Sequence, residues 1–141
     1  MAAINQGRVL LGTIAGWVVW GLWSMGVNIL VLGDRYGSGQ QMGWFLKESR
    51  YPVFLGQWLI TLFLLTYIAT WLYASVRATQ GPGPGTALRV GLVVGFAAGF
   101  PISLSLANWS VMDRVFPLWW MLDLWVGAIL ATLVAGWLYK D

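Results

Sequence analysis

Four long apolar segments alternate with short polar segments along this chain, and one charged residue, Asp123, interrupts them. A helix needs about 20 apolar residues to cross a hydrocarbon core roughly 30 Å thick, and a spanning segment must pair its own backbone groups. The pattern therefore predicts an all-α, membrane-spanning four-helix bundle that forms one domain over residues 1–141. The predicted spans cover residues 9–33, 52–76, 90–112 and 115–139.

The polar joints differ in length and chemistry. Residues 80–85 read Gln-Gly-Pro-Gly-Pro-Gly, which cannot continue a helix and predicts a loop. Asp113 and Arg114 mark a tight turn before the last span. Residues 34–51 mix aromatic and charged side chains, so we expect either a short helix lying at the membrane interface or a plain solvated loop.

Composition supports the membrane assignment and narrows the function. Only 9% of the residues are charged, against about 25% in a typical soluble domain. The chain contains no cysteine and no histidine, so the commonest metal ligands and the commonest general base are missing. Because a single carboxylate lies within the predicted spans, no pair of acids is available there, and an enzyme is the least favoured class.

The eight basic residues divide equally between the two ends of the predicted bundle. This scatter forms no basic stripe for nucleic acid. Because the two counts are equal, the positive-inside rule does not predict the orientation of the chain in the membrane. An even number of spans places both termini on one side, and we favour the cytoplasmic side of a bacterial inner membrane.

The two halves of the chain resemble each other at an offset of 79 residues. Gly12 and Gly16 match Gly91 and Gly95, Ser24 matches Ser103, and Asp34-Arg35 matches Asp113-Arg114. Two tandem helical hairpins in a parallel repeat would produce this spacing. The small residues at four-residue intervals predict close helix packing, within the bundle or against a second copy, and the bundle is favoured.

Polar side chains recur about 6–9 Å inside the end that carries the long joint, at 1.5 Å rise per residue. Asp123 is the sharpest of them, because Gly127 and Ala131 follow on the same helical face and indicate that it points at protein. Either Arg35 or Arg114 could pair with it. Two interpretations stay open: a polar pocket for an ion, a proton or a ligand head group, or a buried hydrogen-bond cluster that fixes helix register. The predicted polar layer consists of Ser24, Asn28, Gln57, Asn108 and Asp123.

Trp17 and Trp20 lie near the middle of the first span, three residues apart. Most of the other tryptophans fall near span ends, as expected of aromatic belts. The central pair either lines a cleft for a non-covalently bound pigment, quinone, porphyrin or lipid, or packs as filler against the glycine ladder of residues 91–99. Filler is the favoured interpretation.

Three short stretches carry a family resemblance: Trp20–Ser24, Leu106–Ser110 and Leu122–Gly127. With them the chain resembles small, uncharacterised bacterial membrane proteins with four spans. It is also faintly similar to the tryptophan-rich sensory proteins, which bind porphyrins. Those proteins have five spans, so the resemblance implies no site residues here, and neither family supplies an activity.

We expect an interaction protein, a non-catalytic accessory subunit of a larger membrane assembly. Its partners would be the lipid bilayer and other membrane proteins or further copies of itself. This interpretation rests on the small extramembrane mass and the absence of a catalytic set. The alternative is a binder or carrier of a hydrophobic ligand or small solute that uses the polar layer near one membrane face.

Overall fold

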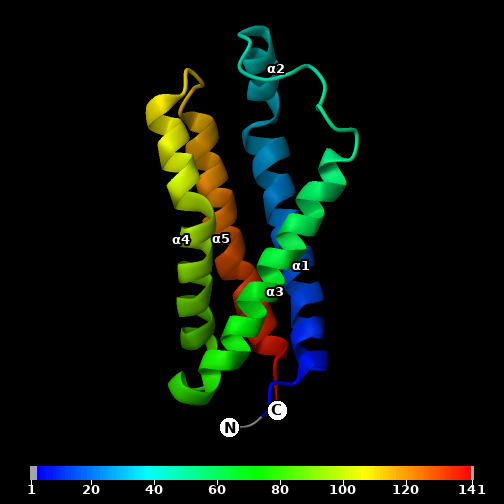
Figure 1. Cartoon of the computed structure of the whole chain (residues 1–141), viewed down its shortest axis with the longest axis vertical. Helices are drawn as coiled ribbons and strands as arrows, with labels where there is room; N and C mark the ends of the chain where they lie inside the picture. The colour runs from blue at the N-terminus through cyan, green and yellow to red at the C-terminus, as the bar shows by residue number, and fades with distance from the viewer. Residues whose placement is uncertain (1–2, 141) are drawn as a thin grey trace.

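The computed structural model describes residues 3–140 and consists of helices joined by short turns (Figure 1). Four helical segments are long and apolar enough to cross a membrane, the first being α1 continued by the π-helix η1. The predicted all-α bundle with four spans is therefore confirmed. The elements are α1 (Gln6–Gly26), η1 (Val27–Val31), α2 (Gly33–Gln41), α3 (Phe54–Gln80), α4 (Pro84–Trp109) and α5 (Val115–Leu138).

The joint between α3 and α4 is shorter than predicted. Helix α3 continues to Gln80, because Arg77 in its last turn is favourable at the negative end of the helix dipole. Helix α4 already begins at Pro84, since a proline in the first turn loses no intrahelical hydrogen bond. Gly81 and Gly83 make the reversal with φ of 85° and 127°, angles that glycine adopts without strain.

The long joint, predicted as a short helix or a loop, holds a short helix in its first half and a non-helical segment in its second. Helix α2 follows η1 directly and ends before the aromatic stretch, where Gly43 has a φ of 78°. The N–H groups of Trp44 and Phe45 then donate to Gly39 O at 2.8 and 3.4 Å, which folds the chain back. As a result the aromatic side chains turn onto the bundle, and residues 42–53 contain no helix.

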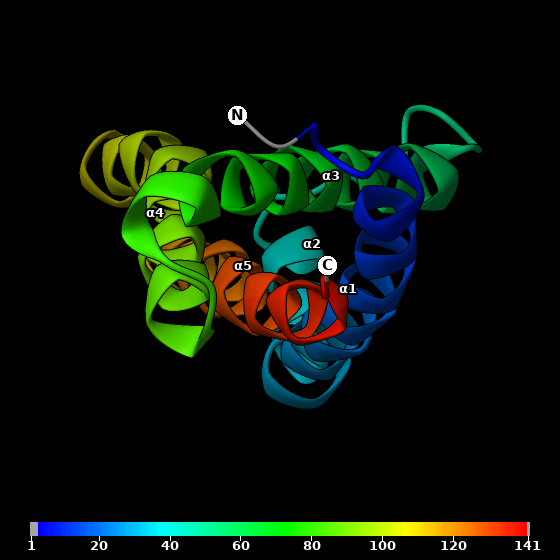
Figure 2. The same cartoon turned by 90° about the horizontal axis from the view of Figure 1, so that it is seen from below.

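Helix α5 packs against α1, α3 and α4 (Figure 2). Its neighbours approach closely through glycine, since lipid supplies no hydrophobic drive between helices and contact depends on packing. A Cβ at Gly16 on α1 would lie 2.7 Å from Ala131 O, and one at Gly95 on α4 would lie 2.8 Å from Trp125 Cα. The glycines of α1 and α4 that the predicted repeat aligns thus face α5 within the bundle.

The two ends of the described chain meet. The backbone N–H of Asn5 donates to Tyr139 Oη at 3.0 Å, so the start of α1 and the end of α5 lie at one end of the bundle. The duplication stays a prediction, and its polar positions differ in setting: Asn28 is half-buried, whereas Asn108 is exposed.

Replacing Gly16 by alanine should destabilise the bundle by about 1–3 kcal/mol, because the new methyl group has to displace the α5 backbone or Thr66. The matched control is Gly21→Ala on the same helix, where a Cβ meets nothing within 4 Å. Unfolding in mixed micelles, followed by tryptophan fluorescence, measures both. Equal stability of the two variants would contradict the packing of α1 on α5.

Candidate functional site

The side chain of Asp123 on α5 is enclosed by protein, with 1% of its surface exposed. Its Oδ2 accepts a hydrogen bond from Ser24 Oγ at 2.8 Å and another from Asn28 Nδ2 at 3.2 Å. Both donors belong to the first span, so the carboxylate links α5 to α1 and η1. A carboxylate at a helix centre costs about 2.5–3.5 kcal/mol on insertion scales, and these two donors offset part of that cost.

Asn28 lies in the π-helical turn, where Leu32 N–H donates to Val27 O at 3.0 Å, five residues back. Its Nδ2 also donates to Ser24 O at 2.9 Å, which fixes the amide beside the carboxylate. The wider turn carries one extra residue and changes the direction of every side chain after it. Single π turns within α-helices are rare and occur often at functional sites.

A tryptophan from the second span completes the contact between helices. Trp58 on α3 donates its Nε1–H to Ser24 Oγ at 3.2 Å, so the serine hydroxyl accepts from α3 while it donates to α5. Trp23 Nε1 donates to the backbone carbonyl of Asp123 at 3.2 Å. Three of the four spans are thereby joined at one point. We call the group of Ser24, Asn28, Tyr36, Trp58 and Asp123 the Asp123 cluster.

Tyr36 on α2 closes the cluster on the side of the long joint. Its hydroxyl donates to Asn28 Oδ1 at 2.7 Å and accepts from Trp120 Nε1 at 3.0 Å. Burial raises the pKa of the Tyr36 hydroxyl, so it stays protonated and continues to donate at neutral pH. Around it, Phe116 packs against Phe45 and Tyr36 with ring centroids 4.8 and 5.3 Å apart. We call Tyr36, Trp44, Phe45, Phe116 and Trp120 the aromatic cap.

Two buried polar atoms, Asp123 Oδ1 and Trp20 Nε1, have no hydrogen-bond partner within residues 3–140. Trp20 lies one turn before Ser24, and its indole packs against Gly127, one turn after Asp123. The two atoms therefore lie on successive turns of the same α1–α5 contact, one an acceptor and the other a donor. An unpaired buried polar group costs about 1–3 kcal/mol, which makes this pair the least satisfied part of the core.

The structure brings together three residues of the predicted polar layer and leaves two outside it. Ser24, Asn28 and Asp123 meet, but Gln57 is exposed on α3, and Asn108 is exposed on α4 with its Nδ2 bonded to Leu104 O at 2.7 Å. The prediction rested on depth along each helix, and depth does not fix the direction around it. The residue after Gln57, Trp58, is the one that turns inward.

The predicted ion pair of Asp123 with Arg35 or Arg114 does not form. Both arginines are exposed, and no ion pair reaches Asp123 from any residue between 3 and 140. Arg35 lies in the first turn of α2, and Arg114 is the N-cap residue of α5. Neutral donors therefore replace the expected cations.

The central tryptophans pack between helices, and Trp20 does not border an open cleft. Trp20 is fully buried against Gly127 of α5 rather than against the glycines of α4, which face α5. Trp17 donates Nε1–H to Leu59 O at 2.9 Å and meets Phe63 edge-on. Both indoles thus fill space between helices, as the favoured interpretation of the sequence held.

Sequence reasoning missed Tyr36, Trp58 and Trp23 as members or neighbours of the site. The tryptophans had been assigned to the aromatic belts by their closeness to span ends. Tyr36 follows Asn28 by eight residues, close to the spacing of one helical face, but residue 33 had been taken as the end of the span. No pattern in the sequence indicates the π turn.

The arrangement limits the chemistry of the Asp123 cluster. Among residues 3–140 no group of three His, Cys, Asp or Glu side chains could hold a metal ion. A serine hydroxyl, a carboxamide, a phenol and one carboxylate can bind a proton or a small polar molecule. They can equally fix the register of three helices.

Substituting Ser24 by alanine should lower the stability of the bundle by about 1–2 kcal/mol, because it removes a donor to Asp123 and the acceptor of Trp58. Ser75→Ala is the control, since that hydroxyl bonds only Trp71 O in its own helix, at 2.8 Å. Denaturant titration in micelles measures the difference. If the Ser24 variant is as stable as the Ser75 variant, the hydrogen bonds of Ser24 to α3 and α5 do not stabilise the bundle.

Comparisons with protein-family models, curated proteins and solved structures give no match to this chain. The family resemblances of the sequence therefore stay predictions.

Proposed function

We propose that this protein is a non-catalytic subunit of a larger membrane assembly and that the outer face of α4 contacts its partner. The observation that carries the proposal is a polar patch on that face: Ser105 and Asn108 are exposed beside Trp109, whose side chain is 92% exposed. Together with Leu104 they line a shallow hollow of about 390 Å³.

A polar patch on the outside of a spanning helix is unfavourable in lipid unless another group covers it. Ser105 Oγ and Asn108 Nδ2 turn back to carbonyls of their own helix, Pro101 O and Leu104 O. The carboxamide oxygen of Asn108 receives no hydrogen bond from the described chain. A helix from a partner could donate to it, and Trp109 supplies the large apolar area that such contacts favour.

The position of α4 in the bundle also favours this face. In Figure 1 the upper half of α4 lies beside α5 alone, on the side away from α1. Gln57 on α3 also exposes a carboxamide within a span. The α4 face differs from it because the exposed carboxamide of Asn108 and the exposed indole of Trp109 line one hollow.

The test places a photo-crosslinking amino acid at Asn108 in native membranes, with the same residue at Ile29 as the control. Ile29 is also exposed and lies near the same end of the bundle, on η1, in a purely apolar setting. We expect a discrete protein adduct from position 108 and lipid adducts from position 29. Matching adduct patterns at the two positions would remove the proposal.

A substitution measures the contribution of the carboxamide. Asn108→Leu should reduce recovery of the partner about threefold, the loss expected from one membrane hydrogen bond of about 0.6 kcal/mol. The melting of the isolated subunit should stay unchanged, because Asn108 is exposed. Quantitative mass spectrometry after purification in mild detergent reads the recovery, and undiminished recovery contradicts a contact through this residue.

A second candidate function is reversible binding of a proton or small polar solute at Asp123. The specific observation is the enclosed Oδ1 without a hydrogen-bond partner, next to the unpartnered indole N–H of Trp20. Ionisable groups within spans frequently mark proton or ion pathways. A proton requires no cavity, so the dense packing around the carboxylate does not exclude it.

Infrared difference spectra between acidic and alkaline buffer test this candidate. A protonatable Asp123 gives a carboxyl C=O band at acidic pH that disappears at alkaline pH and is absent in Asp123→Asn. The control is Asp34→Asn, because Asp34 is exposed at the start of α2, outside the spans, and its substitution should leave this band unchanged. A spectrum that Asp123→Asn leaves unchanged would eliminate proton binding at this site.

A further inference from the structure

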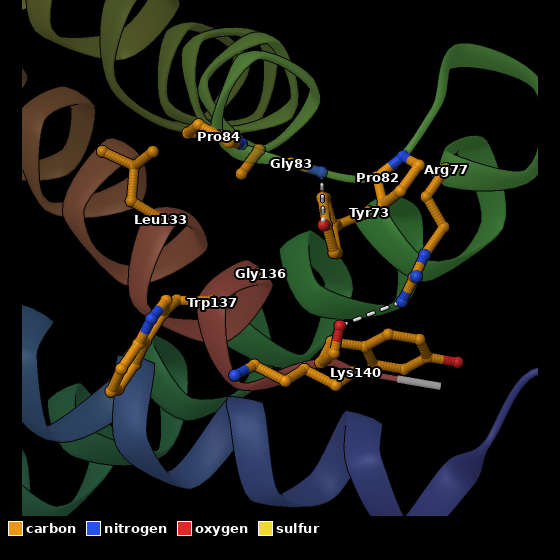
Figure 3. Close-up of a pocket in the computed structure, with 11 residues that line it drawn as sticks. Tyr73, Arg77, Pro82, Gly83, Pro84, Leu133, Gly136, Trp137 and Lys140 are labelled. Carbon is orange, nitrogen blue, oxygen red and sulfur yellow. Dashed lines mark hydrogen bonds between the residues drawn. The ribbon is translucent and has the colours of Figure 1, made fainter.

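A second hollow, of about 460 Å³, opens at the end of the bundle that holds both termini (Figure 3). It lies where α3 ends, α4 begins and α5 ends. Its wall includes Tyr73, Arg77, Pro84, Gly136, Trp137 and Lys140. We propose that this hollow, which we call the basic pocket, binds the phosphate headgroup of an anionic phospholipid, with the start of an acyl chain lying along α5.

Two cations form the polar rim of the basic pocket. Lys140 is exposed, its ammonium lies 5.9 Å from the centre of the Trp137 ring, and no ion pair joins it to the part of the chain that the structure describes. The Arg77 guanidinium donates to Tyr139 O at 2.9 Å and lies 4.8 Å from the Tyr139 ring centre. Its charge is therefore held in place at the wall, whereas Lys140 can turn towards a ligand.

The described charged residues at this end are basic, which favours an anion. Arg8 and Arg89 lie at the same end as Arg77 and Lys140, on the first turn of α1 and the second turn of α4. The acidic residues that the structure describes lie towards the other end: Asp34, Glu48, Asp113 and Asp123. Asp141 falls outside the described residues. A basic cluster at the membrane surface attracts anionic lipid by about 1 kcal/mol per lysine or arginine.

The floor of the basic pocket is apolar and runs into the membrane. Leu133, Gly136 and Trp137 follow one face of α5, so Leu133 lies about 6 Å deeper along the helix than Trp137 at 1.5 Å per residue. Lys140 lies just beyond the end of the helix. A Cβ at Gly136 would come within 3.0 Å of Ala87 Cβ and 3.2 Å of Tyr73 Cζ. The floor is thus closed against the bundle interior.

This combination matches an amphiphile better than a free anion. The cations lie at the level of the helix ends, where lipid phosphates lie, and the apolar groove continues to the depth of acyl chains. The rim is partly preformed, since Gly83 N–H donates to Tyr73 Oη at 3.2 Å and fixes the turn that borders the pocket (Figure 3). Inorganic phosphate would use the rim and leave Leu133 and Trp137 unoccupied.

Native mass spectrometry of the detergent-purified protein tests the proposal with three probes: phosphatidylglycerol, phosphatidylcholine and inorganic phosphate. We expect preferential binding of phosphatidylglycerol, weakened about fivefold in Lys140→Gln, the factor for one basic residue at the surface. Lys47→Gln removes the same charge at the opposite end and should bind as the unsubstituted protein does. Lys140→Arg should retain binding, and unchanged tryptophan fluorescence confirms that each variant is folded.

Three results would contradict the binding of an anionic phospholipid in the basic pocket. Equal loss in the Lys140 and Lys47 variants would show that net charge alone attracts the lipid. Displacement of phosphatidylglycerol by inorganic phosphate would assign the rim to a free anion. Trp137→Ala should lower phosphatidylglycerol retention without altering any phosphate binding, and unchanged retention would contradict the acyl-chain groove.

Discussion

A carboxylate inside a lipid bilayer has no water to solvate it, so the protein around it must supply every hydrogen bond that keeps it there. In this molecule Asp123 obtains those bonds from Ser24 and Asn28 on the first span, and Ser24 in turn accepts from Trp58 on α3. Three spans meet at one polar point because the carboxylate cannot be left bare. The π turn carries Asn28, which donates to the carboxylate, and the rings of the aromatic cap pack around Tyr36, which donates to Asn28.

Tryptophan and glycine act as complementary partners in this bundle. Glycines let α1 and α4 approach the α5 backbone, while indole N–H groups donate across helix boundaries: Trp17 to Leu59 O and Trp125 to Leu92 O. Each such bond joins two spans and satisfies an indole that lipid could not satisfy. Trp20 is the exception, because Gly127 leaves room for its ring but gives its N–H no acceptor.

The two ends of the molecule differ in how their polar side chains are placed. At the end of the long joint, aromatic rings pack over the Asp123 cluster and separate it from the surrounding charges. At the end with both termini, the side chains of Arg77 and Lys140 border the basic pocket, and Lys140 is exposed. One end is therefore closed around its polar groups, and the other leaves a cation exposed. The outer face of α4 is a third feature, and its exposed carboxamide lies within a span.

The sequence by itself determined the fold class, the four spans and the inward direction of Asp123, because apolar length and small-residue spacing are local properties that lipid enforces. Ser24 and Asn28 were correctly placed with it, since both precede the same end of span one. Only the tertiary structure decided that Gln57 and Asn108 face outward, that Arg35 and Arg114 stay away from the carboxylate, and that Trp58 and Tyr36 complete the site. The rotation of each helix about its axis depends on packing against all its neighbours at once. The extra residue in a π turn changes that rotation as well, and no pattern in the sequence indicates it.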